Sequence, residues 1–144
     1  MAKWTKNTFI KKTKNNCISH VSMIMLDLIK FSEDNADQIV WGSGDHYGTM
    51  TYKCKSIDHG FIPLFYITTQ GRIKISINLL RSKLSQPEII KDFQLKLESN
   101  FLMDFDSFDY PNDVYHSLEE MFTMRSEVGK FITTIKSLSA RLHQ

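Results

Sequence analysis

The sequence has little of what marks several classes of protein. It contains two cysteines, three prolines and six glycines among 144 residues. Two thiols do not suffice for the disulfide framework of a small secreted domain. The longest apolar stretch, 21–31, is interrupted by Asp27 and Lys30 and is well short of the roughly 20 apolar residues that cross a bilayer. We therefore expect a soluble globular protein, with no role for the membrane.

The chain also lacks a linker, a repeat and a secretory signal. No segment is rich in Pro, Gly or Ser, so a single domain over residues 1–144 is expected. Residues 1–16 contain five lysines and no acid, but no apolar segment with a cleavage site follows, which favours the cytoplasm. These lysines, among them Lys11 and Lys12, either attract phosphate or anionic lipid or belong to a flexible, solvated chain end.

The small net charge of the whole chain hides two halves of opposite charge. Lys and Arg number 18 against 16 Asp and Glu, for a formal net charge of +2. Residues 1–82 hold 11 basic and 6 acidic residues, whereas residues 83–144 hold 7 and 10. The first half therefore has a net charge of +5 and the second half −3. This asymmetry favours recognition of an anionic partner by the first half of the chain.

Hydrophobic periodicity predicts helices at both ends and strands between them. Apolar residues recur every three or four positions over 18–31, which is typical of an amphipathic helix. Strict alternation over 47–55 and 72–80, with an apolar run over 61–69, indicates strands. A short strand at 39–41 precedes them. Gly71 supplies the positive φ that a tight hairpin turn between 61–69 and 72–80 requires.

The 3.6-residue period returns in the second half. Helices are predicted over 87–99, 117–124 and 126–142, the first two with capping-box sequences at Ser85 and Ser117. Residues 101–112 form an aromatic and acidic loop. The expected fold is α+β, with an N-terminal helix, a four-stranded antiparallel meander and three C-terminal helices packed on one sheet face.

Three glycines close to one another form the most conspicuous local motif. Their spacing matches neither a dinucleotide-binding fingerprint nor a P-loop, and a strand follows instead of a helix. We expect a strand-to-strand turn with positive φ at some of these glycines. The alternative is a ligand site formed by the turn. The residues concerned are Trp41, Gly42, Gly44, Asp45, His46 and Gly48.

No constellation of catalytic or metal-binding residues is evident. The two cysteines and five histidines show no ligand spacing such as C-x-x-C or H-x-x-x-H. Cys17 and His20 share a helical face, but a pair at this spacing arises often by chance. The aspartates of the loop at 101–112 lack the glycine and terminal glutamate of a calcium-binding loop. We therefore expect no metal, no cofactor and no catalytic residue, which favours a non-enzymatic role.

A basic sheet face is the feature that remains. If the predicted strands pair as a meander, Lys53, Lys55, Arg72 and Lys74 lie on the face opposite the buried residues. With tyrosines such as Tyr66 and Tyr47 accessible, this face is suited to a nucleic-acid backbone. Alternatively, these lysines protect exposed strand edges from aggregation.

Three segments resemble a widespread bacterial and archaeal domain of unknown function. They are Trp4 with Phe9, then residues 39–50 with Trp41 and Gly42, and residues 64–75. The domain's pattern is W-x-x-x-x-F, a central W-G-x-G-x-x-x-G-S-F and a strand with T-x-G-x-V-x-I. The resemblance implies an accessory or recognition module, some of whose relatives accompany nuclease or restriction-related proteins, in DNA-related or phage-defence systems.

Two functional hypotheses follow. In the first, the protein is a non-enzymatic accessory domain that binds nucleic acid weakly through the N-terminal lysines and the basic sheet face. In the second, it binds a protein or small ligand through the turn at 41–48 and the aromatic segment 101–110. The sequence leaves the partner and the oligomeric state open.

Overall fold

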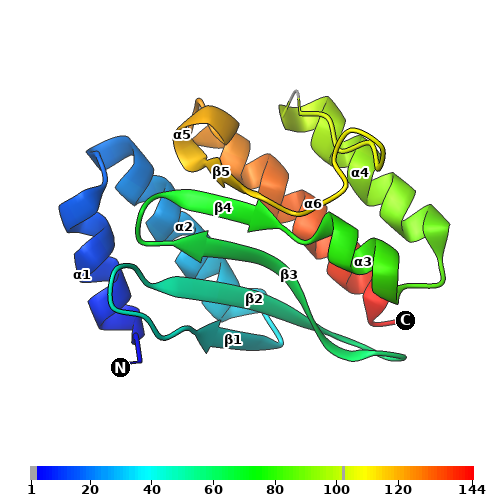
Figure 1. Ribbon diagram of the computed structural model, residues 1–144, viewed down its shortest axis with the longest axis horizontal. Helices are drawn as coiled ribbons and strands as arrows, with labels where there is room; N and C mark the ends of the chain where they lie inside the picture. Colours follow the sequence, from blue (N-terminus) through cyan, green and yellow to red (C-terminus); the bar gives the residue numbers. More distant parts are fainter. Residues whose placement is uncertain (1–2, 102) are drawn as a thin grey trace.

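The computed structural model describes residues 3–101 and 103–144, and its elements form an α+β fold. Within that part of the chain, two N-terminal helices precede a five-stranded antiparallel sheet, and further helices follow (Figure 1). None of the described helices is long and apolar enough to cross a membrane. In chain order the elements are α1 (Lys6–Asn16), α2 (Ser19–Asn35), β1 (Gln38–Trp41), β2 (Thr49–Ser56), β3 (Gly60–Thr68), β4 (Arg72–Ile75), α3 (Ile77–Lys83), α4 (Pro87–Phe101), β5 (Tyr115–Ser117), α5 (Leu118–Met121) and α6 (Ser126–Leu142).

The prediction of one N-terminal helix is wrong, because residues 6–16 form an additional helix, α1. Its N-terminus has a capping box in which Thr5 and Thr8 exchange side-chain and backbone hydrogen bonds. Its buried residues are Phe9 and Thr13, and the Phe9 ring packs 5.3 Å from that of Trp41. So narrow an apolar stripe gives little helical periodicity in the sequence.

The prediction of a strand over 72–80 is half right. β4 ends at Ile75 and α3 begins at Ile77. The Asp113 carboxylate accepts hydrogen bonds from the backbone N–H groups of Asn78 and Leu79, at 2.9 and 3.2 Å. This carboxylate, 35 residues away in the sequence, satisfies helix N–H groups that have no partner inside the helix. Local alternation gave no sign of it.

The prediction of four strands is wrong because β5 adds a fifth. Tyr115 pairs with Lys74, and Ser117 with Arg72, antiparallel to β4. The predicted capping role of Ser117 is absent too, since its side chain makes no capping hydrogen bond at α5. The strands are ordered β1-β2-β3-β4-β5, so the sheet is a simple meander as expected.

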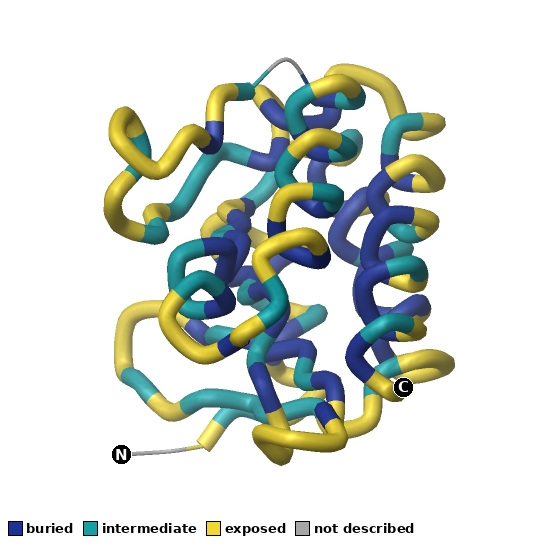
Figure 2. Tube along the Cα trace, turned by 90° about the vertical axis from the view of Figure 1, so that its right-hand side faces the viewer, coloured by how far each residue is buried: buried dark blue, intermediate teal, exposed yellow. Residues whose placement is uncertain are grey.

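The helices α2 and α6 cover one face of this sheet. They lie behind the strands in Figure 1, and Figure 2 shows buried residues along the inner sides of the helices. Aromatic rings connect the layers: Tyr52 stacks on Phe31 of α2 at 5.4 Å and on Phe65 at 5.0 Å, and Phe65 meets Phe131 of α6 at 5.1 Å. The core is therefore a sandwich of one sheet and one layer of helices.

The two glycines of positive φ in the described chain lie in hairpin turns, Gly60 at +71° and Gly71 at +77°. A Cβ at Gly71 would lie 3.0 Å from Val21 Cγ1 and 3.2 Å from Cys17 Sγ, whereas one at Gly60 would meet nothing within 4 Å. The turn at Gly71, whose positive φ was predicted, thus also packs beneath α2.

We expect Gly71→Ala to lower the free energy of unfolding by about 2 to 3 kcal/mol, from backbone strain plus close contact. Gly60→Ala, its matched control, costs only the strain, about 1 kcal/mol. Urea unfolding followed by circular dichroism measures both. Equal losses in the two variants would contradict the packing of the turn against α2.

Candidate functional site

The face of the sheet opposite α2 and α6 carries a continuous row of polar and aromatic residues. The strand register aligns Thr51 with Tyr66, Tyr66 with Lys74, and Lys74 with Tyr115, so the row crosses four strands. Tyr52 and Phe65, their neighbours in sequence, point into the core. This second face looks toward the viewer in Figure 1, and no helix crosses in front of the middle of β2 and β3. We call it the open sheet face.

Lys74 lies between two tyrosine rings at the centre of this row. Its Nζ is 4.5 Å from the centroid of Tyr66 and 4.9 Å from that of Tyr115. A cation over an aromatic face is attracted by the ring quadrupole, by about 0.5–1 kcal/mol at exposed sites. The two rings therefore hold the ammonium in position, while all three side chains stay partly accessible.

Phe61 and Lys55 form a second cation–aromatic pair on the open sheet face. Phe61 is 46% exposed, and Lys55 Nζ lies 5.8 Å from the centroid of its ring. Lys53 is half-buried on the same face, two residues before Lys55 on β2. A lysine thus contacts an aromatic ring at two places on the face, at Lys55 and at Lys74.

The cations of the open sheet face are not neutralised by neighbouring acids. Within the described residues, Lys53, Lys55, Arg72 and Lys74 make no ion pair. Asp113 borders the face near Tyr66, and the Asp37 carboxylate accepts a hydrogen bond from the backbone of Lys55 at its other end. Burial first, and then the charge of Asp113, raises the pKa of the Tyr66 phenol. Since its carboxylate is engaged by the N-terminus of α3, Asp113 leaves the four cations without a direct partner.

Three tyrosines gather at the β5 side of the face. Burial raises the pKa of Tyr115, and the nearby phenols of Tyr47 and Tyr66 raise it further. Tyr47 is 40% exposed. The sequence had indicated Tyr47 and Tyr66, but Tyr115 was missed because nothing in the local pattern predicted β5.

Lys11 and Lys12 do not join this surface. α1 packs through Phe9 against Trp41, which is paired with Met50 and therefore lies on the covered side of the sheet. Lys11 is exposed and Lys12 half-buried on that helix. The six basic residues predicted as one binding set therefore divide into two separate surfaces.

The glycine turn is explained by packing. None of Gly42, Gly44 and Gly48 has a positive φ, so the expectation of left-handed glycines there is wrong. The indole of Trp4 covers the turn: its Nε1 donates to the Gly44 carbonyl at 2.9 Å, and a Cβ at Gly48 would lie 2.7 Å from Trp4 Cδ2. Because Gly48 has no side chain, the Trp4 ring can approach its backbone closely. Asp45 and His46 are exposed at the tip of this turn.

The aromatic segment 101–110 belongs partly to the core. Phe105 is fully buried and packs edge-on against Tyr110, whereas Phe108 is 89% exposed. A hollow of about 490 Å³ lies between α4 and residues 106–107, with Arg81 at its wall. The Arg81 guanidinium donates to Gln94 Oε1, Asn78 Oδ1 and the Phe105 carbonyl, so its hydrogen bonds are largely used within the fold.

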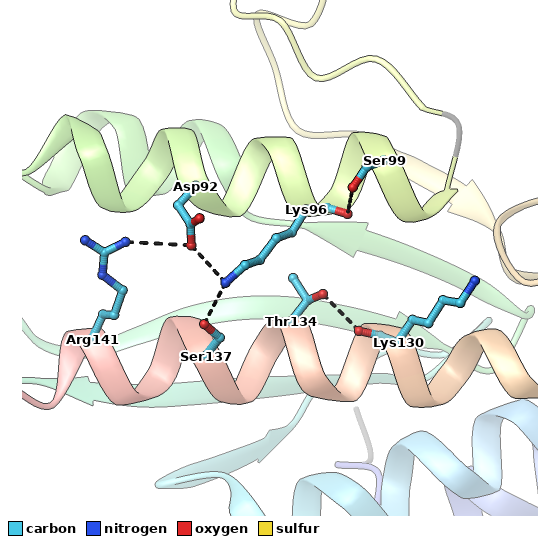
Figure 3. Close-up of polar contacts among 7 residues, drawn as sticks. All are labelled: Asp92, Lys96, Ser99, Lys130, Thr134, Ser137 and Arg141. Carbon is cyan, nitrogen blue, oxygen red and sulfur yellow. Dashed lines mark hydrogen bonds and ion pairs between the residues drawn. The ribbon is translucent and has the colours of Figure 1, made fainter.

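A charged seam joins α4 and α6 on the helical side of the molecule (Figure 3). Lys96 Nζ lies 3.0 Å from Asp92 Oδ2 and donates to Ser137 Oγ at 2.9 Å, and Arg141 is 3.7 Å from the same Asp92 oxygen. Lys130 extends its ammonium away from this group. Asp92 therefore offsets the two cations, which makes the seam a packing contact.

Three residues from distant parts of the chain converge at the end of the sheet. Asp37, Cys54 and His143 place their ligand atoms within 4.8 Å of one another. Sequence spacing missed the group because its members are 17 and 89 residues apart. It is not a nucleophilic triad: His143 meets both partners through Nε2, whereas a triad uses both ring nitrogens. Burial also raises the pKa of the Cys54 thiol to about 11.

The other suspected pair, Cys17 and His20, contacts two different carbonyl groups. Cys17 Sγ donates to the Thr69 oxygen at 3.5 Å, and His20 Nε2 lies 3.2 Å from the Phe122 oxygen. Burial raises the pKa of Cys17 as well. This arrangement activates neither side chain.

Comparison with known proteins yields no relative: no protein-family model, no curated protein and no solved structure matches the chain. The resemblance to the bacterial and archaeal domain therefore stays a prediction.

We expect Gly48→Ala to destabilise the protein by about 2 kcal/mol, because the added methyl group displaces the Trp4 ring. Gly129→Ala on α6 is the control. A Cβ there meets nothing within 4 Å, and alanine is the better helix former, so a gain of up to about 1 kcal/mol is expected. Thermal unfolding compares the two, and an unchanged stability in Gly48→Ala would contradict the packing of Trp4 on the turn.

Burial lowers the pKa of His116 below its ordinary value of 6.5, with the charge of Glu120 opposing the shift. As the pH falls below about 6.5, the unfolded chain therefore takes up a proton that the folded state resists. The free energy of unfolding is expected to fall over this range by less in His116→Gln than in the wild type. Urea titrations at about pH 7.5 and 5.5 measure this, and equal losses would contradict it.

Proposed function

We propose that the protein is a non-enzymatic recognition module that binds single-stranded nucleic acid on its open sheet face. The observation that carries this proposal is the row in which Lys74 is held between Tyr66 and Tyr115 on an uncovered face. Nearby cations suit phosphate groups, and accessible aromatic rings suit stacking of unpaired bases. A sheet face with accessible aromatic rings favours a single strand, since duplex recognition usually needs an element that enters a groove.

Edge protection explains these lysines less well than binding does. Lysines that prevent aggregation belong on edge strands. Lys53 pairs across to Gln38 of β1 and Pro63 of β3, and Lys74 pairs across to Tyr66 and Tyr115. Both residues therefore lie in interior strands. Their charge needs another reason, and recognition of an anion supplies one.

Two further features support a non-enzymatic, accessory role. The thiols of Cys17 and Cys54 have raised pKa values, which supports a role without nucleophilic chemistry. The resemblance described above supports an accessory role in a DNA-related or phage-defence system. A cytoplasmic location would suit both. Lys11 and Lys12 would then add only long-range attraction.

The second candidate is a module that binds a small ligand or a protein through segment 101–110. The hollow beside α4 favours it. In that case Leu95→Glu, at the exposed wall of the hollow, would abolish binding of the ligand, whereas reversal of charge on the open sheet face would not.

The test measures fluorescence anisotropy of labelled oligo-dT and oligo-U, about 12 nucleotides long, at low salt. Charge reversal at four positions of the open sheet face should weaken binding by more than about tenfold. The matched control reverses four exposed lysines on the helical side, and we expect it to weaken binding by less than about threefold. The changed residues are Lys53, Lys55, Arg72 and Lys74 in the first variant, and Lys30, Lys91, Lys130 and Lys136 in the control.

Two further readouts separate the electrostatic and stacking contributions. Each phosphate contact on a single strand contributes about −0.7 to the slope of log K against log salt, so four contacts give about −3. Tyr66→Ala should weaken binding by about tenfold and leave this slope nearly unchanged, because it removes stacking and no charge. Absence of binding at low salt, or equal loss in the two charge-reversed variants, would overturn the proposal.

A further inference from the structure

Asp37, Cys54 and His143 form a mixed set of metal ligands at the end of the sheet. Asp37 precedes β1, Cys54 is on β2, and His143 follows the last turn of α6. His143 Nε2 donates to Asp37 Oδ2 at 2.6 Å and lies 3.5 Å from Cys54 Sγ. A carboxylate, a thiol and an imidazole thus converge on one point. The group is separate from the open sheet face, because the Cys54 side chain points to the covered side.

The spacing of the three atoms is close to that of a tetrahedral zinc site. Zn²⁺ binds thiolate sulfur at about 2.3 Å and imidazole nitrogen at about 2.0–2.1 Å, which separates the two by about 3.6 Å in a tetrahedron. The observed 3.5 Å between Cys54 Sγ and His143 Nε2 agrees with this value. The contact between His143 and Asp37 is shorter than the site needs. It can widen by side-chain rotation, since both residues are exposed.

Hydrogen bonds of the surrounding backbone fix the positions of the three ligand residues. The Lys55 N–H donates to Asp37 Oδ2 at 2.7 Å, which orients the carboxylate. The Ile57 N–H donates to the Leu142 carbonyl, which keeps the end of α6 against the end of β2. Ser139 is one helical turn before His143 and so shares its face. Its hydroxyl oxygen is buried and has no hydrogen-bond partner in the described chain, and its carbonyl lies 4.0 Å from Cys54 Sγ.

We propose that these three side chains bind one Zn²⁺ ion, with a fourth position taken by water. Thiolate, imidazole and carboxylate together suit zinc, whereas Mg²⁺ and Ca²⁺ prefer oxygen ligands alone. On binding, the Cys54 thiol loses its proton to solvent and sulfur coordinates as thiolate. His143 coordinates through Nε2 as the neutral imidazole tautomer that carries its single proton on Nδ1.

Bound zinc would tie the end of α6 to β1 and β2. It would stabilise the folded state because the unfolded chain does not hold the three ligands together. The effect is structural, and it does not depend on nucleic-acid binding.

The experiment titrates the metal-free protein with ZnCl₂ by calorimetry and with CoCl₂ by absorption spectroscopy. We expect one Zn²⁺ per chain, a rise in Tm, proton release, and the near-ultraviolet charge-transfer band of a cobalt–thiolate bond. His143→Gln should weaken binding at least tenfold, and Cys54→Ser should remove the cobalt band. Cys17→Ser, which changes the other cysteine, should leave both unchanged.

Because Cys54 is buried and its substitution can unfold the protein, His143→Gln and Asp37→Asn carry the decisive comparison. Both residues are exposed. His59→Gln, an exposed histidine of the β2–β3 turn, controls for adventitious surface binding. The proposal would be overturned if the wild-type protein did not bind one Zn²⁺ ion per chain. It would also be overturned by binding that His143→Gln and Asp37→Asn leave unchanged, or by a cobalt spectrum without a thiolate band in the wild type.

Discussion

The structure depends on a sheet that is buried on one face only. The stacked rings of Phe31, Tyr52 and Phe65, closed by Phe131, connect α2, the sheet and α6 in a single aromatic contact. Rings of this size bury much of the apolar area that stabilises the fold. Because side chains alternate along a strand, fixing Tyr52 and Phe65 inward forces their neighbours outward. The core therefore determines what the open sheet face presents.

What that face presents is unusual for a surface that only has to be soluble. Cations unpaired within the described chain lie beside accessible aromatic rings on interior strands, and Lys74 is held between two of them. The negative charge of the second half lies mainly in the loop between α4 and β5 and at the start of α5, whereas α1 carries lysines on the covered side. The row of unpaired cations on the sheet, and not the charge difference between the two halves of the chain, therefore supports recognition of an anion by the sheet.

Local periodicity predicted the features that arise from local physics. The α+β class, the meander, the Gly71 turn and the orientation of Lys53, Lys55 and Lys74 all follow from alternation and turn chemistry. The features it missed depend on contacts between distant residues. Asp113 ends β4 by capping α3, Tyr115 joins the sheet only through Lys74, and Asp37, Cys54 and His143 meet only after folding. No single-sequence pattern carries this information.

The claim that the open sheet face is the binding surface can be tested by mapping contacts on the folded protein. Amide chemical shifts would be recorded by NMR while a short single-stranded oligonucleotide is added. The structure predicts that the largest shifts fall on the outward residues of β2 to β5, centred on Tyr66, Lys74 and Tyr115, with few on α4 and α6. Shifts centred on α1, on the helical side or on the hollow beside α4 would contradict it.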